Sequence, residues 1–360
     1  MIRTTHDHFI GCLLGGACGD ALGWPAEFNS IQTIIDTYGP DGITELQPGD
    51  EGLYEVTDDT QMTLFTAEGL LRAWCQSRHS AGIPDFRAGL MKSYRSWLAT
   101  QDSTIDVDIS HGWLYGIPEL HNERAPGRTC LAALYHLDLS SSGIAENDSK
   151  GCGGVMRVAP AGLFAARVNN GDMNGTARLA FELGCMAAAL THGHPTGYYP
   201  AGVFAAIIAV IICGGTIEEG ASTGLTFLDG RIGSQETIDA VQAALDIWKD
   251  KSVLPSAEAI ESLGGGWVAE EALAIGIYCA LCAGDDFVRG VRLAVNHSGD
   301  SDSTGSITGN ILGALLGQSP LPSKWLKHLE LRDVITRIGE DLFTVYEPTE
   351  SWCANYPVVM

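Results

Sequence analysis

Apolar residues recur along this chain mainly at intervals of three and four residues, which is the spacing of an amphipathic helix. Strand-type alternation of apolar and polar residues is scarce. The helical spacing is seen at Ile10, Leu14, Ala17 and Ala21, at Met62, Phe65 and Leu70, and at Ile307, Ile311 and Leu315. The pattern therefore predicts an all-α fold.

Three alanine-rich segments, 177–190, 201–212 and 269–283, are apolar on nearly all faces. A helix with this composition is buried in the core of a large protein or spans a membrane. The longest apolar run, 201–213, is shorter than the ~18 residues that mark a membrane helix. We therefore expect helices buried inside a multilayered bundle, and no membrane partner.

Glycines occupy every fourth position of the first predicted helix, at Gly11, Gly15, Gly19 and Gly23. On a helix the first three would line up as a smooth groove for another backbone, at a cost of ~1 kcal/mol each relative to alanine. We expect Gly23 to end the helix, because the Trp-Pro pair that follows cannot continue it. Glu27 is therefore predicted to lie on a loop.

The 360 residues exceed a typical domain, yet no linker rich in Ser, Pro or Gly divides them. We expect a single domain over residues 1–360. The formal net charge of −23 would repel a phosphate backbone, so we expect no nucleic-acid partner.

The ten cysteines are scattered, and most lie inside apolar segments, as reduced core thiols do. Cys279 and Cys282 form a C-x-x-C pair, but no second pair or nearby histidine completes a zinc site, so we expect them to pack in a helix. The N-terminal residues do not resemble a signal peptide. These features predict a cytoplasmic protein.

Residues 299–305 gather two carboxylates and three hydroxyls into one turn ahead of an apolar helical run. Ligands that are all oxygen suggest a hard cation. A calcium loop of the EF-hand type fits at Asp300, Asp302 and Gly305 but fails at its fifth position, Thr304, and its twelfth, Ile311. A simple helix cap is the other explanation, although one cap does not require two carboxylates.

A second acidic turn, Thr57-Asp58-Asp59-Thr60, also precedes an amphipathic stretch, and Thr57 or Asp58 could cap that helix. Together the two turns predict two acidic helix N-termini in an apolar bundle, where unneutralised carboxylates would repel one another. Shared divalent cations would remove this repulsion. Four carboxylates with flanking hydroxyls are enough to hold two ions, and paired metals usually bind and polarise substrate oxygens.

Three further segments have the composition of ligand contacts. The glycine-rich turn 149–154 could bind phosphate through its backbone N–H groups. His192 and His194 follow an alanine-rich helix, where the helix dipole alone also favours histidine. Trp267 follows three glycines, and it could stack on a ligand ring or merely pack.

The ordered set of motifs resembles the ADP-ribosylglycohydrolase family, which includes the dinitrogenase-reductase-activating glycohydrolase. The resemblance runs through most of the chain. It rests on residues 15–23 with Glu27, Thr57-Asp58-Asp59-Thr60, residues 151–160, Thr191-His192, Gly265-Gly266-Trp267 and residues 297–305.

The resemblance implies a compact orthogonal multi-helix bundle with a site for two Mg²⁺ or Mn²⁺ ions that grips the hydroxyls of the distal ribose. The metal ligands expected by position are Thr57, Asp58, Asp59, Asp300, Asp302 and Ser303. The expected substrate contacts are Ser149, Gly151, Gly153, His192 and Trp267. Ser303, rather than Thr304, falls on the hydroxyl-ligand position of the family, and Lys150 and Cys152 depart from residues found in some members.

The implied reaction is hydrolysis of the bond between the anomeric carbon of ADP-ribose and a modified protein side chain. A carboxylate would activate water or protonate the leaving group, and Asp58, Asp59 and Glu27 are the candidates. Arginine is the leading side chain, because residues 57–71 and 300–305 most resemble the arginine-directed branch. A serine linkage stays open.

The expected partner is an ADP-ribosylated protein. The enzyme could also be an immunity protein that counters an ADP-ribosyltransferase toxin, by reversing its modification or by plugging its cleft. The alternative is a non-catalytic relative that binds ADP-ribose or blocks a partner's active site. Such a relative would have lost acidic ligands, and none is missing here.

Overall fold

The computed structural model describes residues 3–80, 82–105, 112–137, 143–169, 172–345 and 349–356. Within these ranges the chain forms seventeen α-helices, five short 3-10 turns and no named strand, which confirms the predicted all-α fold. The two isolated β-bridges in the described ranges join Tyr54 to Leu329 and Gly151 to Val268.

The first nine helices are α1 (His6–Gly23), α2 (Ile31–Tyr38), α3 (Asp58–Ser80), α4 (Phe86–Gln101), α5 (Arg128–Tyr135), α6 (Ala159–Val168), α7 (Met173–Ala189), α8 (Pro195–Ile212) and α9 (Ile217–Thr226). The other eight are α10 (Gln235–Lys249), α11 (Ala257–Glu261), α12 (Ala269–Ala283), α13 (Phe287–Val295), α14 (Ser301–Leu316), α15 (Ser323–Lys327), α16 (Arg332–Thr344) and α17 (Glu350–Ala354).

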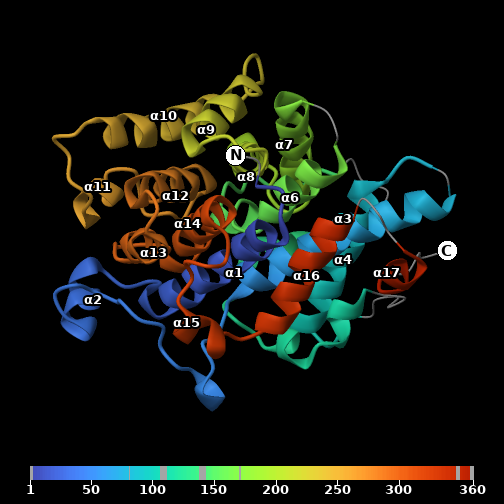
Figure 1. Cartoon of the computed structure of the whole chain (residues 1–360), viewed down its shortest axis with the longest axis horizontal. Coiled ribbons are helices and arrows are strands. Elements are labelled where there is room, and N and C mark those ends of the chain that lie inside the picture. Colours follow the sequence, from blue (N-terminus) through green and yellow to red (C-terminus); the bar gives the residue numbers. More distant parts are fainter. Residues whose placement is uncertain are drawn as a thin grey trace.

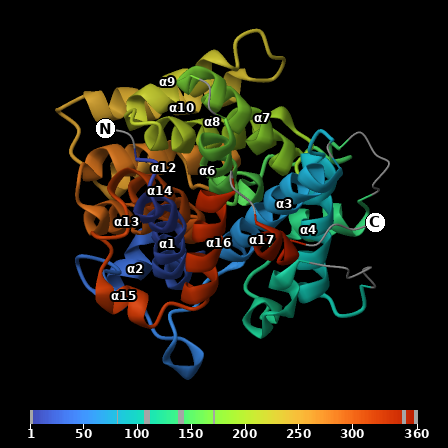
Figure 2. The same cartoon turned by 45° about the vertical axis from the view of Figure 1, so that its right-hand side comes forward.

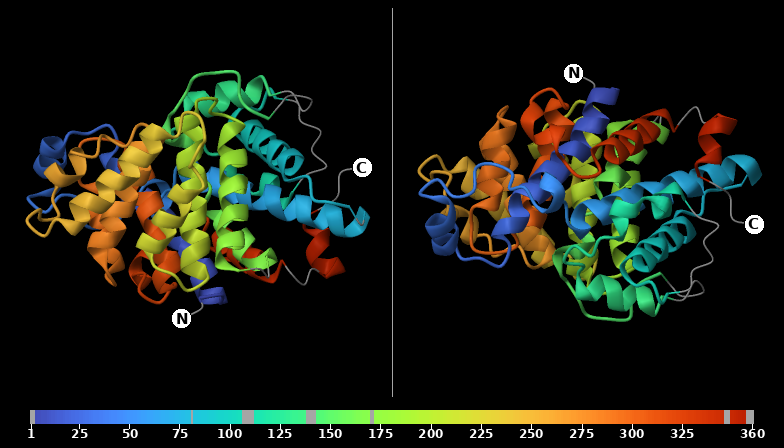
Figure 3. Two further views of the ribbon diagram at one scale, coloured as in Figure 1. Left: turned by 90° about the horizontal axis from the view of Figure 1, so that it is seen from above. Right: turned by 90° about the horizontal axis from the view of Figure 1, so that it is seen from below.

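Helices from distant parts of the sequence lie side by side. Figures 1 and 2 show α1, near the N-terminus, against α14, and α16 beside α1. Seen from above in Figure 3, the green and yellow helices α7 to α9 lie between the orange α12 to α14 on one side and the blue and cyan α3 and α4 on the other. The core is therefore built from contacts between segments that are far apart in the chain.

The glycines of α1 pack directly against the backbone of α14. A Cβ atom added at Gly15 would overlap the carbonyl group of Gly309, and one added at Gly19 would overlap that of Gly305. The overlap is reciprocal, because the glycines of α14 meet the carbonyl oxygens of α1 in the same way. The predicted close packing is thus confirmed, since only glycine permits this approach of two backbones.

Gly23 is the last residue of α1, as the sequence predicts. It also has a packing role that the sequence analysis did not assign, because a Cβ there would overlap the backbone of Ser301 at the start of α14. The contact between α1 and α14 therefore extends to the N-terminus of α14.

The alanine-rich segments form the buried helices that were expected. In α8 all but two residues are buried, and α12 is buried along most of its length. By length and composition α8 could cross a membrane, but 89% of the residues in its most apolar stretch are buried inside the structure, as in a core helix. Cys279 and Cys282 lie on α12, in the helix position predicted for them.

Substitution of Gly19 by alanine should destabilise the protein, because the new methyl group forces α1 and α14 apart. The expected loss is about 1–3 kcal/mol, the usual cost of overpacking a core. Urea unfolding followed by circular dichroism measures it.

The matched control is Gly116→Ala, because an added Cβ at Gly116 has open space around it. This variant should stay within about 0.5 kcal/mol of the parent. A Gly19→Ala protein as stable as the Gly116→Ala control would contradict the close helix contact.

Candidate functional site

The two acidic turns lie at helix N-termini, as the sequence predicts. Asp300 caps α14, and its Oδ1 accepts a hydrogen bond from the Ser303 backbone N–H at 3.3 Å. Thr57 precedes α3, and its Oγ1 accepts from the Asp59 N–H at 3.2 Å. Capping therefore explains one side chain in each turn, and it leaves the other carboxylates without such a role.

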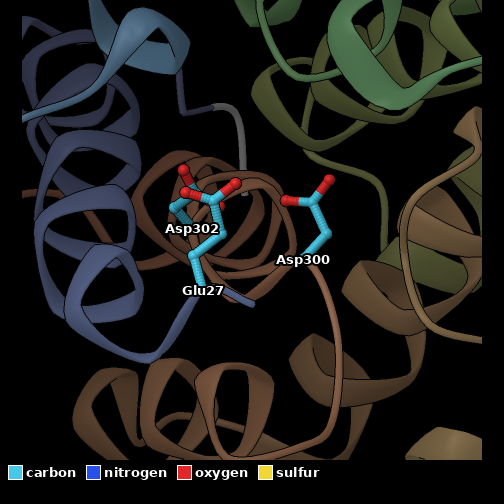
Figure 4. Close-up of side chains that lie close together, drawn as sticks. All are labelled: Glu27, Asp300 and Asp302. Carbon is cyan, nitrogen blue, oxygen red and sulfur yellow. The ribbon is translucent and has the colours of Figure 1, made fainter. Parts of the chain in front are cut away.

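Three carboxyl groups meet beside α14. One oxygen atom from each of Glu27, Asp300 and Asp302 lies within 4.8 Å of the others. Figure 4 shows Glu27 on the segment that follows α1 and both aspartates at the beginning of α14. Glu27 follows the 3-10 turn Trp24–Ala26, which places it on a loop, as predicted.

The carboxyl groups of the acidic turn at the start of α3 interact electrostatically with the same cluster. Burial raises the pKa of Asp58 to about 7, and the carboxylates of Asp20 and Asp300 contribute to the increase. Burial, with repulsion from Asp20 and Asp58, holds the pKa of Asp59 well above its usual value. Burial raises the pKa of Glu27 to about 8, and the charges of Asp300 and Asp58 add to this.

Within the described part of the chain, no protein counter-charge is paired with the cluster. None of the ion pairs found in the described ranges involves these carboxylates. The buried atoms Asp59 Oδ1 and Asp302 Oδ1 have no hydrogen-bond partner there either. A buried unpaired carboxylate is costly, and the carboxylate and hydroxyl groups of the two turns offer oxygen ligands. The site therefore fits divalent cations of the Mg²⁺ type.

The hydroxyl groups of the α14 turn differ in how they are used. Thr304 Oγ1 is occupied by bonds to the carbonyl oxygens of Ala294 at 2.8 Å and Asp300 at 2.9 Å, and by a contact with His297 Nε2 at 3.0 Å. Ser303 Oγ contacts sulfur atoms instead, Met156 Sδ at 3.9 Å and the thiol of Cys152. Of these two hydroxyls, that of Ser303 is therefore the more available to a cation, and Ser301 Oγ also lacks a hydrogen-bond partner in the described part of the chain.

Asp20 on α1 is a site residue that the sequence analysis missed. It is buried, and its carboxylate accepts hydrogen bonds from the backbone N–H groups of Thr57 at 3.1 Å and Thr60 at 3.2 Å, and from Thr60 Oγ1 at 2.5 Å. Burial raises the pKa of Asp20 to about 6, although these hydrogen bonds oppose the shift. Its signal in the sequence was a carboxylate inside a glycine- and alanine-rich helix, where a charge needs a partner.

The glycine-rich turn and His192 lie together. The Gly151 N–H donates to Ser149 Oγ at 3.4 Å, and a Cβ added at Gly153 would lie 3.3 Å from His192 Cε1. Burial, with the charge of Arg157, lowers the pKa of His192 to about 3, so the imidazole is neutral. A charged histidine favoured by the helix dipole is therefore the wrong explanation for His192.

The segment that carries Trp267 joins this turn to the carboxylate cluster. The Cys152 N–H donates to the Trp267 carbonyl oxygen at 3.1 Å, and the Asp300 N–H donates to the Gly265 carbonyl oxygen at 2.8 Å. A third link is the Cys152 thiol, which donates to Asp300 Oδ2 at 2.7 Å. The predicted substrate contacts and metal ligands are thus parts of one connected site.

Two polar residues of the predicted contact segments turn away from the cluster. Lys150 Nζ pairs with Glu236 at 2.9 Å and with Glu270 at 2.5 Å. His194 caps α8, and its Nδ1 accepts from the Thr196 N–H at 3.1 Å. An anion at the glycine-rich turn would therefore depend on backbone N–H groups rather than on the lysine.

Comparisons with known proteins place these observations in a family. The model of the ADP-ribosylglycohydrolase family matches residues 1–351. The ADP-ribosylarginine hydrolase Tri1 of Serratia proteamaculans is 27% identical, with 94% of this chain and 79% of that protein covered. The ADP-ribosylhydrolase ARH3 of Mus musculus is 24% identical, with 94% and 92% covered. A solved structure of an ADP-ribosylglycohydrolase-related protein complex shares the fold, with a TM-score of 0.63 and 24% identity over 95% of this chain and 98% of that one.

The metal-free protein should lose stability as the pH rises from 5 to 8. The carboxyl groups of Asp20, Asp58 and Glu27 have pKa values raised to about 6, 7 and 8, so the folded chain holds protons that the unfolded chain has already released. The unfolding free energy then falls with pH over this range. The melting temperature in EDTA should drop by several degrees, at about 1–2 °C for each kcal/mol in a chain of this length.

The variant Asp302→Asn removes one charge from the cluster and should raise the melting temperature in EDTA at pH 8. Mg²⁺ should stabilise the parent at pH 8 and the variant much less. The exposed Asp229, substituted in the same way, serves as the control. Destabilisation by Asp302→Asn in EDTA would show that the carboxylates do not repel one another as described.

Proposed function

This chain belongs to the ADP-ribosylglycohydrolase family, and we propose that it is a metal-dependent hydrolase that removes ADP-ribose from arginine side chains of proteins. The observation that carries this proposal is the buried carboxylate cluster, whose atoms Asp59 Oδ1 and Asp302 Oδ1 have no partner in the described part of the chain. The glycine-rich composition of the neighbouring turn is suited to a diphosphate, which backbone N–H groups commonly bind.

In this proposal two Mg²⁺ or Mn²⁺ ions are held by Thr57, Asp58, Asp59, Asp300, Asp302 and Ser303. When bound, such ions bind ribose hydroxyls and lower the pKa of a water molecule. Asp20 keeps the turn before α3 in position through its hydrogen bonds to Thr57 and Thr60. It acts on the site by positioning these ligands.

Of the three candidate acids and bases, Glu27 is best placed to move a proton. Asp58 and Asp59 are buried, and Asp58 Oδ2 already accepts from the Gly127 N–H at 3.0 Å. Glu27 is partly exposed and lies on a loop, so its carboxyl group can face a substrate. It would accept a proton from the attacking water and deliver one to the departing nitrogen as the bond between nitrogen and the anomeric carbon breaks.

The arginine linkage has less support than the hydrolase activity. One relative is named as an ADP-ribosylarginine hydrolase and another as ARH3, at similar identities of 27% and 24%. The second candidate is hydrolysis of serine-linked ADP-ribose, which the sequence analysis leaves open. The toxin partner and the cytoplasmic location stay predictions from the sequence.

The direct test measures release of ADP-ribose from ADP-ribosyl-arginine and ADP-ribosyl-serine peptides, with Mg²⁺, with Mn²⁺ and with EDTA. We expect metal-dependent release from the arginine peptide. The variant Asp302→Ala should lose metal binding, measured by calorimetry, together with more than about 100-fold of its activity.

The control for this variant is Asp229→Ala, which removes an exposed carboxylate and should retain activity within about 2-fold. Full activity of Asp302→Ala would refute the ligand assignment. A parent protein that binds metal but releases ADP-ribose from neither peptide would refute the hydrolase proposal for these linkages.

A further inference from the structure

Two large aromatic side chains are exposed beside the carboxylate cluster. The side chain of Phe28 is 73% exposed and that of Trp267 is 41% exposed. Their rings stack on each other, with centroids 5.0 Å apart and planes inclined by 23°. We call this pair the aromatic platform. Exposed apolar surface at a rim of polar residues is typical of a binding site.

The backbone holds the Phe28 ring in place at an energetic cost. Phe28 has a φ of 63°, a left-handed conformation that a bulky side chain rarely adopts. The Asn29 side chain stabilises the turn by donating to the carbonyl oxygens of Pro25 at 3.2 Å and Glu27 at 3.3 Å. Strain of this kind persists where the surrounding structure enforces it, and such places are commonly functional.

The Trp267 side of the platform is also fixed to the site. Gly265 and Gly266 precede it, and their N–H groups donate to Glu271 Oε2 at 3.0 and 3.2 Å. A Cβ added at Gly266 would lie 3.3 Å from the Asp300 Cβ, so this segment lies directly on the acidic turn. The platform therefore joins the loop of Glu27 to the start of α14.

We propose that the Phe28–Trp267 platform binds the planar, cationic guanidinium group of an ADP-ribosylated arginine and so selects the arginine linkage over the serine linkage. This inference rests on the proposed hydrolase function. A guanidinium stacks on aromatic faces and is attracted by their electrons, most strongly by tryptophan. A serine linkage offers neither a plane nor a charge.

The position of the platform favours the guanidinium over the adenine ring as the bound group. Phe28 directly follows Glu27, which belongs to the carboxylate cluster. The guanidinium is bonded to the reacting anomeric carbon, whereas the adenine lies beyond the diphosphate and a second ribose. The carboxylate of Glu27 also complements a positive charge.

The test removes each ring without changing the fold. Phe28→Asn deletes the ring and keeps a residue that tolerates positive φ, and Trp267→Ala deletes the other ring. Both variants should lose about 10-fold in kcat/KM on the ADP-ribosyl-arginine peptide. Their losses in kcat/KM on the ADP-ribosyl-serine peptide and in calorimetric affinity for free ADP-ribose should be smaller, so that the preference for arginine over serine falls.

Two controls accompany these variants. Phe28→Tyr keeps a ring and should retain the preference for arginine. Tyr135→Ala removes a side chain that is 62% exposed and is not part of the site, so it should behave as the parent. If a ring-deleted variant lost as much affinity for free ADP-ribose as it lost kcat/KM on the arginine peptide, the platform would be an adenine site and the proposal would be wrong. Unchanged selectivity for arginine over serine in both ring-deleted variants would also overturn the proposal.

A binding measurement tests the guanidinium-binding role of the platform even if the protein is not a hydrolase for these linkages. If the parent turns over neither peptide, its calorimetric affinity for the ADP-ribosyl-arginine peptide is compared with that for free ADP-ribose. The platform predicts about 10-fold tighter binding of the peptide, lost in Trp267→Ala. If the parent bound the ADP-ribosyl-arginine peptide and free ADP-ribose equally tightly, the proposed role of the platform would be overturned.

Discussion

The contact between the backbones of α1 and α14 is the constraint on which the site depends. Glycines on both helices remove the Cβ atoms at the closest points of the interface, where the carbonyl groups of each helix meet the opposite backbone. The contact runs to Gly23 and Ser301, where α1 ends and α14 begins. It therefore brings Glu27, just beyond α1, to the two aspartates at the start of α14. A bulkier interface would separate these groups by at least the width of a methyl group.

The same helix contact positions the second acidic turn. Asp20 lies on α1 between the packing glycines, and from there it binds the N-terminus of α3 through Thr57 and Thr60. The helix α1 thus contacts both acidic turns. Their carboxylates stay together in the folded chain, although burial and mutual repulsion raise the pKa values of several of them. The proposed divalent cations would relieve this repulsion. Backbone N–H groups, a neutral His192 and the aromatic platform surround the cluster, while Lys150 is held in ion pairs with Glu236 and Glu270.

Several features could be predicted because they depend on local chemistry. The spacing of apolar residues and the local composition predicted the helices. The spacing of the glycines predicted which face of α1 packs against another backbone. The acidic turns were expected at helix N-termini, since capping and the helix dipole act within one turn of chain. Glu27 was expected on a loop because proline at position 25 ends the helix. The choice of Ser303 over Thr304 came from the family resemblance. The structure gives a physical reason for it, because Thr304 Oγ1 is already in contact with His297 and with backbone carbonyl oxygens.

Other features had no local signal. The link from Asp20 to the turn before α3, the thiol of Cys152 on Asp300 and the stack of Phe28 on Trp267 each join segments that are distant in the chain. The sequence by itself determined which segments are helical, where they end and which turns carry the oxygen-rich chemistry, because these follow from interactions over a few residues. Only the tertiary structure decided which turns share one site and which side chains face it, because that depends on how closely α1 and α14 can pack, and packing distance is a property of two surfaces together.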